Sequence, residues 1–218
     1  MTRVLVLALA AMFVAGCGSK PRAPDWQMNA HDGLERYVAA FMSGNARVEA
    51  VEFDNALKAL ESTGQPALVA RAELTRCAAR VASLDFGDCP GFERLRADAP
   101  AAERAYADYL AGRVSPEEIA MLPEQHRAAA SAQGDASPAV SGIEDPFARL
   151  VAAGVLLRNG RADPRVLAKA SDTASAQGWR RPLLAWLGVQ ARRAEQAGAA
   201  DEAQRLRRRI ALVAGGGK

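Results

Sequence analysis

Apolar residues along this chain recur at intervals of three and four positions, which is the spacing of one face of an α-helix. In segment 30–42 this face is formed by Leu34, Tyr37, Val38 and Phe41. No segment alternates apolar and polar residues as a half-buried strand does, and β-branched residues are sparse. We therefore expect an all-α protein. The predicted helices are 30–42, 47–60, 66–84, 92–97, 100–110, 147–157, 163–177, 183–197 and 201–213.

Short polar segments interrupt this pattern. Ser115-Pro116-Glu117-Glu118 is typical of a helix start, with a capping serine and carboxylates in the first turn, and Pro123 interrupts that helix soon afterwards. Segment 132–145 is rich in Gly, Ser, Asp and Pro, so we expect a linker there. It separates an N-terminal helical region at 26–131 from a C-terminal helical region at 146–214. The sequence leaves open whether the two regions form one stack or two bodies.

Two stretches share a rhythm of aromatic and small residues. One runs from Tyr37 to Leu57 and the other from Trp186 to Leu206. Their spacing resembles that of tetratricopeptide-type repeats, although neither stretch has the full consensus. The resemblance implies antiparallel helical hairpins stacked as a tetratricopeptide-like solenoid, and an irregular bundle is the alternative.

The first twenty residues have the pattern of a removable signal. Arg3 precedes an apolar run of about 11 residues, whereas a membrane-spanning helix needs roughly 20. Val14-Ala15-Gly16-Cys17 then resembles the lipobox of bacterial lipoproteins. This resemblance implies that residues 1–16 are a signal peptide, that Cys17 carries the lipid and that residues 17–25 form a tether. The alternatives are an ordinary secretory signal with a coincidental cysteine and an uncleaved anchor.

Taken whole, the chain resembles a family of uncharacterised proteobacterial lipoproteins with an α-helical, tetratricopeptide-like periplasmic body. The residues that carry the resemblance are the lipobox, Asp25-Trp26, segment 76–80 with Cys89, and segment 177–184. In lipoproteins a residue other than aspartate after the lipidated cysteine, here Gly18, implies the outer membrane of a Gram-negative bacterium. The resemblance implies no activity.

Cys77 and Cys89 form an even pair in the oxidising compartment that the lipobox implies. We expect a disulfide that joins the end of one helix to the loop before the next, and the alternative is two separate buried thiols. Such a disulfide stabilises the fold by about 3 kcal/mol in the chain-entropy description. We expect no metal site, because His31 and His126 are far apart and neither has a ligand spacing to a cysteine.

Charge is distributed unequally along the chain. The net charge is +3, but residues 17–146 contain 13 basic and 20 acidic side chains, whereas residues 147–218 contain 14 and 5. The two halves therefore attract each other, or the second half faces an anionic partner. An arginine content that reflects codon bias is a third interpretation. The candidate binding surface comprises Trp179, Arg180, Arg181, Arg205, Arg208 and Arg209.

No catalytic signature stands out in the sequence, and we expect neither enzymatic activity nor a cofactor. Glu117 and Glu118 are explained by the dipole of the helix that they begin. Ser131 and Ser141 lack a nucleophile elbow, and no glycine-rich loop has the pattern of a phosphate site.

The leading hypothesis is a binding or scaffold lipoprotein that holds an envelope protein partner at the outer membrane, to which its N-terminal lipid attaches it. The alternative is an electrostatic module whose basic half docks on anionic lipid or cell wall. An enzyme acting on the cell wall is a remote alternative. The periplasmic location excludes nucleic acid as a partner.

Intact-mass analysis of the protein purified from its native membrane tests the lipobox prediction. We expect a chain that begins at Cys17 and carries the additional mass of acyl chains, because two or more such chains are needed for stable attachment. A bare residue 17, or a leader that is still attached, contradicts the prediction.

Overall fold

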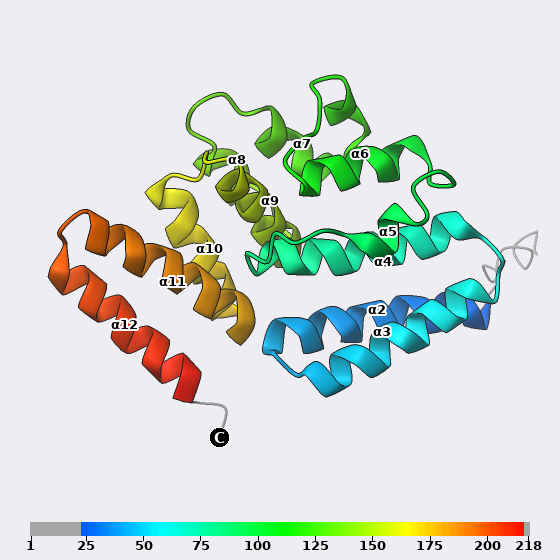
Figure 1. Cartoon of the computed structure of the whole chain (residues 1–218), viewed down its shortest axis with the longest axis horizontal. Coiled ribbons are helices and arrows are strands. Elements are labelled where there is room, and N and C mark those ends of the chain that lie inside the picture. Colours follow the sequence, from blue (N-terminus) through cyan, green and yellow to red (C-terminus); the bar gives the residue numbers. More distant parts are fainter. Residues whose placement is uncertain (1–22, 216–218) are drawn as a thin grey trace, which may run out of the picture.

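The computed structural model describes residues 23–215, which form α-helices, a 3₁₀-helix and no strand (Figure 1). The predicted all-α class is confirmed. The predicted signal peptide at 1–16, Cys17 and most of the predicted tether lie outside the described residues. The helices are α2 (Asp25–Ser43), α3 (Ala46–Glu61), α4 (Pro66–Ala82), α5 (Pro90–Glu93), α6 (Ala101–Leu110), the 3₁₀-helix η2 (Glu118–Met121), α7 (Glu124–Ser131), α8 (Ser137–Ser141), α9 (Pro146–Arg158), α10 (Pro164–Ala176), α11 (Arg180–Gln196) and α12 (Ala200–Gly215).

Several helices begin or end at residues that suit these positions. Asn45, Asp145 and Asp163 precede α3, α9 and α10, and each side chain accepts a hydrogen bond from the backbone N–H three residues later. Gly44 ends α2 in the left-handed conformation, with φ of 80°. Because the connections are short, α2 and α3 fold back on each other as an antiparallel hairpin (Figure 1).

The first three helices pack through aromatic and small residues. The ring centroid of Tyr37 in α2 lies 4.9 Å from that of Phe53 in α3. Gly33 faces Ala56, and a Cβ atom at position 33 would lie only 3.1 Å from the Cβ of Ala56. Glycine therefore lets α2 and α3 approach closely. Both helices pack against α4.

The helix α9 is central to the fold. It contacts α4, α6, α7, α8 and α10, and almost every residue from Ala148 to Leu156 is buried. A helix that is apolar on all sides is typical of such a position. Gly154 allows α9 to cross α4 closely, because a Cβ at that position would collide with the carbonyl oxygen of Val81.

Two contacts attach α11 to the N-terminal helices. Trp186 is fully buried, and its indole Nε1 donates a hydrogen bond of 3.0 Å to the carbonyl oxygen of Ala82 at the end of α4. Arg181 lies 3.9 Å above the ring of Phe41 and donates a 2.9 Å hydrogen bond to Glu49. Residues more than 100 positions apart in sequence are therefore joined at one end of α2, α3 and α4.

The predicted N-terminal and C-terminal regions share one hydrophobic core, whose buried members extend from Tyr37 to Leu206. Segment 132–145, where we expected a linker, contains α8, and Val140 of α8 is fully buried in that core. Within the described residues the two regions therefore pack together as one body.

The last helix, α12, packs mainly against α11, with Ala203 and Leu206 buried between them. Along the longest axis of the molecule, α12 lies at the end opposite to the start of α2 (Figure 1). Within residues 23–215, every helix is too short or too polar to cross a bilayer.

Two local predictions need refinement, and two short helices were not predicted. Ser115 and Glu118 form the reciprocal hydrogen bonds of a capping box, but only the four-residue 3₁₀-helix η2 follows before Pro123. In place of the helix expected at 92–97, the structure has the short helix α5, which ends at Glu93, and turns follow it. The short helices α7 and α8 were not predicted individually, because eight and five residues are too few to show a periodic pattern.

Candidate functional site

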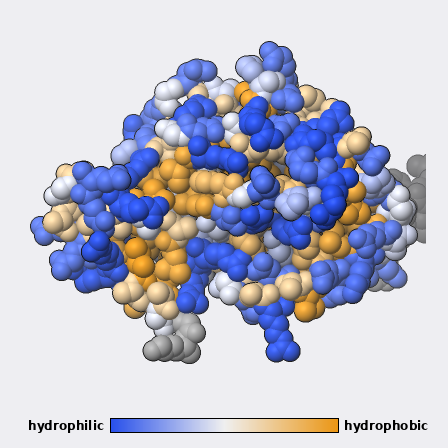
Figure 2. All heavy atoms as spheres, in the orientation of Figure 1, coloured by the Kyte–Doolittle hydropathy of each residue, from blue (hydrophilic) through white to orange (hydrophobic). Residues whose placement is uncertain are grey.

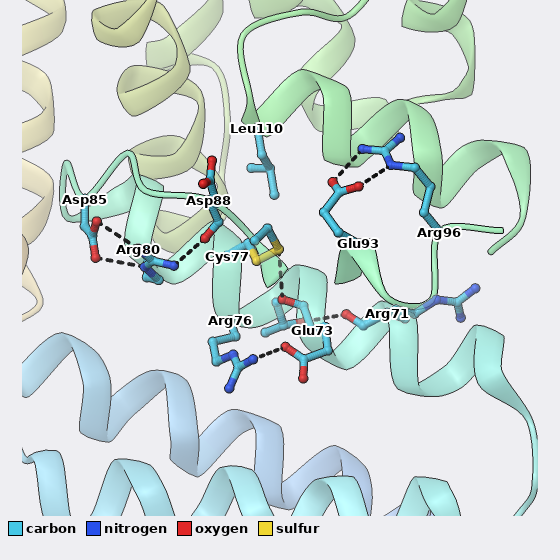
Figure 3. Close-up of a disulfide and its surroundings, with 12 residues drawn as sticks. Arg71, Glu73, Arg76, Cys77, Arg80, Asp85, Asp88, Glu93, Arg96 and Leu110 are labelled. Atoms are coloured by element: carbon cyan, nitrogen blue, oxygen red, sulfur yellow. Dashed lines mark hydrogen bonds and ion pairs between the residues drawn. A yellow bond between two sulfur atoms is a disulfide. The ribbon is translucent and has the colours of Figure 1, made fainter. Parts of the chain in front are cut away.

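Cys77 of α4 and Cys89, which precedes α5, lie at disulfide distance with their Cα atoms 5.9 Å apart. The predicted pairing is confirmed. Arg80 holds the intervening loop, because its guanidinium donates two hydrogen bonds to Asp85 and one to the carbonyl oxygen of Asp88 (Figure 3). The hydrogen bonds from Arg80 lower the pKa of Asp85 below its ordinary value. The loop is therefore fixed by one covalent bond and one ion pair.

A cleft of about 640 Å³ lies beside these cysteines, between α4, α5, α6 and the end of α9; we call it the disulfide cleft. Leu110 of α6 points toward the cysteine pair, and Arg96 pairs with Glu93 beside it (Figure 3). The hydrogen bonds from Arg96 lower the pKa of Glu93. The lining residues are Leu74, Cys77, Arg80, Val81, Gly87, Asp88, Cys89, Pro90, Glu93, Arg96, Ala107, Asp108, Leu110, Ala111, Arg113 and Arg158.

Arg158 differs from the other arginines of the disulfide cleft. This residue is half-buried, and its guanidinium donates one hydrogen bond, of 3.3 Å, to the carbonyl oxygen of Leu110. The guanidinium carbon lies 5.6 Å from the ring centroid of Phe86. By contrast, Arg96 and Arg113 both pair with Asp108. Within residues 23–215, no carboxylate pairs with Arg158.

The structure divides the predicted binding surface into two parts, and three of its six residues hold the fold together. Trp179 is partly buried against the core, as expected of a tryptophan that opens an apolar helix. Arg180 donates hydrogen bonds to the carbonyl oxygens of Val213 and Ala214 at the end of α12. Arg181 contacts α2 and α3 as described above. These side chains are therefore engaged within the protein.

The other three predicted residues point outward from α12. Arg205, Arg208 and Arg209 are exposed, and the helical spacing places Leu212 on the same face. Leu212 is 78% exposed, more than any other large apolar residue of the described chain. Arg205 pairs with Glu202, whereas Arg208 and Arg209 form no ion pair with a described residue. We call Arg205, Arg208, Arg209 and Leu212 the α12 stripe. In Figure 2, hydrophilic residues dominate the visible surface of this helix.

The charge asymmetry along the sequence is mostly not neutralised across the fold. Two ion pairs join residues 17–146 to residues 147–218 among the described residues, namely Arg181–Glu49 and Arg165–Asp135. Other arginines of the C-terminal region bind backbone carbonyl groups, as Arg149 binds Ile143 and Arg193 binds Ala162. Attraction between the two halves therefore explains only one arginine of the predicted surface.

His126 of α7 is buried in an aromatic cluster. Its ring lies 5.1 Å from that of Tyr109 and 5.6 Å from that of Tyr106. Burial lowers the pKa of His126 from 6.5 to about 4. His126 and Tyr106 also line a smaller cleft of about 460 Å³, at whose side Arg71 pairs with Glu103. His126 is thus a neutral group of the core near pH 7.

Neither serine considered as a nucleophile contacts His126 within the described residues. The hydroxyl of Ser131 donates to the carbonyl oxygen of Arg127 in its own helix, and Ser141 ends α8. His31, Asp32 and Glu35 place possible ligand atoms within 4.8 Å of one another on α2, but all three residues are exposed. His31 and Glu35 form an i,i+4 pair, and exposed pairs of this kind are common on helices.

Comparison with known protein families, with curated proteins and with solved structures gives no match to this chain.

The burial of His126 predicts a loss of stability in mild acid. The folded protein keeps this side chain neutral down to about pH 4, whereas the unfolded chain binds a proton below about pH 6.5. Stability is therefore lost as pH falls through this window. We expect the free energy of unfolding in urea to fall by about 2 kcal/mol more in wild type than in His126→Phe between about pH 7 and pH 5.

His31→Phe is the matched control, because His31 is exposed and is the other histidine of the chain. This variant should retain the wild-type pH dependence. Equal losses of stability in wild type and in His126→Phe would show that His126 is not the group responsible.

Proposed function

We propose that this protein is a lipid-anchored binding protein that holds an acidic envelope protein through the α12 stripe. The observation that supports this best is the outward direction of Arg205, Arg208 and Arg209 on a terminal helix that packs mainly on α11. The lipobox at Cys17 supports attachment to the outer membrane of a Gram-negative bacterium, with the body in the periplasm. The protein acts by contact rather than by catalysis.

The chemistry of the α12 stripe suits a protein surface. Guanidinium groups bind carboxylates through two parallel hydrogen bonds, and arginine is enriched at protein interfaces. Arg208 and Arg209 have no ion pair with a described residue that a partner would first have to break. Leu212 adds an exposed apolar side chain to the same face, which favours a partner with an apolar contact over one that is only charged.

The position of α12 also favours a partner away from the lipid. The chain enters the body at Asp25, the start of α2, and α12 lies at the other end of the longest axis (Figure 1). A lipid at Cys17 therefore holds the first end near the membrane and leaves α12 to face outward. A helical hairpin lies at each end of the body, formed by α2 with α3 and by α11 with α12. Stacked hairpins serve as binding scaffolds in tetratricopeptide-type proteins, and this supports the proposal.

Docking on anionic lipid or cell wall is the second candidate function, because exposed arginines bind phosphate and carboxylate groups of any source. The two candidates differ in what the stripe touches. A protein partner gives a discrete covalent adduct with a photoreactive residue in α12. A polymer or bilayer gives co-sedimentation that weakens steeply with salt.

Photo-crosslinking in intact envelopes tests the proposal. A photoreactive amino acid at Gln204, which is exposed one turn before Arg208, should form one discrete adduct with an acidic envelope protein. In the double variant Arg208→Glu/Arg209→Glu we expect the yield of this adduct to fall by about tenfold or more, because two attractive charges become repulsive.

Arg47→Glu/Arg94→Glu is the matched control, since both arginines are exposed and form no ion pair with a described residue. It has the same change of net charge and should keep the adduct. An adduct that forms equally with both double variants overturns the assignment to α12. If no protein adduct forms and anionic vesicles or peptidoglycan bind wild type but not Arg208→Glu/Arg209→Glu, the second candidate is correct instead.

A further inference from the structure

The disulfide cleft has the size and composition of a small-molecule site. Its volume of about 640 Å³ falls within the range of roughly 300 to 1,000 Å³ that such sites occupy. Leu74 and Val81 of α4 and Leu110 of α6 form an apolar floor beside the cysteine pair. The disulfide and the ion pair of Arg80 with Asp85 fix the loop that closes one side. The cleft is therefore held open by contacts that need no ligand.

Four arginines and three carboxylates line the cleft, and a further carboxylate, that of Asp85, pairs with the lining Arg80. The cations are Arg80, Arg96, Arg113 and Arg158, and the anions are Asp88, Glu93 and Asp108. Arg80 and Arg96 are occupied by carboxylates of the protein. Arg113 pairs with Asp108, so Arg158 is the lining arginine without a carboxylate partner among the described residues. A ligand with several negative charges would be repelled by the three lining carboxylates, whereas a single negative charge can pair with Arg158.

Arg158 is the group best placed to bind such a charge. A guanidinium has five N–H donors, and among the described residues Arg158 donates a hydrogen bond only to the carbonyl oxygen of Leu110. It is half-buried, so its charge is partly removed from water without a compensating carboxylate. A carboxylate from outside would supply this missing partner through two parallel hydrogen bonds.

We propose that the disulfide cleft binds a small amphipathic molecule with one carboxylate, which pairs with Arg158 while its apolar part lies on Leu74, Val81 and Leu110. Arg113, which is more exposed and pairs with Asp108, contributes at the rim. This site shares no residue with the α12 stripe. It adds a small-molecule ligand to a protein whose proposed function is to bind a protein partner.

Titration of the folded protein with 4-phenylbutyrate, followed by ¹H–¹⁵N NMR, tests the proposal. We expect shifts confined to the backbone amides of the cleft and to the Nε–Hε group of Arg158. 4-Phenylbutyramide has the same apolar body without the charge and should bind at least about tenfold more weakly, since it lacks the charge-assisted pair. Arg158→Gln should weaken 4-phenylbutyrate binding by a similar factor, and Arg158→Lys should lose less.

Arg94→Gln is the matched control, because Arg94 is exposed on the neighbouring turn, does not line the cleft and forms no ion pair with a described residue. It should bind 4-phenylbutyrate like wild type. Because Arg158→Gln also removes the bond to Leu110, Arg113→Gln provides a second variant, with an expected loss of a few fold. The proposal is overturned if 4-phenylbutyrate and 4-phenylbutyramide bind equally well, or if wild type and Arg158→Gln bind 4-phenylbutyrate equally well. It is also overturned if inorganic phosphate binds more tightly than 4-phenylbutyrate.

Discussion

The hydrogen bond from the indole of Trp186 to the carbonyl oxygen of Ala82 is the contact on which the arrangement of the other helices depends. The last carbonyl groups of a helix have no partner within the helix, and burying one without a partner is costly. Ala82 ends α4 in the interior, where Trp186 satisfies its oxygen. This contact fixes α11 against α4. In turn α11 positions Arg181 over Phe41 and provides the surface on which α12 packs.

Arginine has three different tasks in this protein. Some arginines, such as Arg149 and Arg180, satisfy carbonyl groups at helix ends and loops, and therefore act as part of the fold. Others, such as Arg80, pair with acidic side chains that hold a loop. A third group, which includes Arg158, Arg208 and Arg209 as well as exposed arginines such as Arg47, forms no ion pair with a described residue and has capacity for an external anion. The excess of positive charge in the C-terminal half is thus a poor guide by itself to where a partner binds.

The sequence predicted the long helices well, because their apolar periodicity extends over several turns, as in 30–42 within α2. It also predicted the Cys77–Cys89 pair. It left open whether the basic residues face the acidic half or an external partner, and the structure gives both outcomes, with Arg181 bound to Glu49 and Arg208 exposed. It could not predict that Arg181 binds Glu49, because the two residues are 132 positions apart. The same reason applies to the disulfide cleft, whose walls come from α4, α5, α6 and α9. Gly154 likewise looks unremarkable in the sequence, although its lack of a side chain allows α9 to cross α4.

Native-state hydrogen exchange of wild type and Trp186→Phe tests the central role of the Trp186–Ala82 contact most directly. The variant keeps an aromatic ring but leaves the Ala82 carbonyl oxygen without its donor, at a cost of about 1 to 3 kcal/mol. We expect the amides of α4, α9 and α11 to lose protection together and by the same free energy. Loss of protection confined to α11 and α12, with α2 to α4 unchanged, would contradict the view that this contact unites the two regions in one cooperative body.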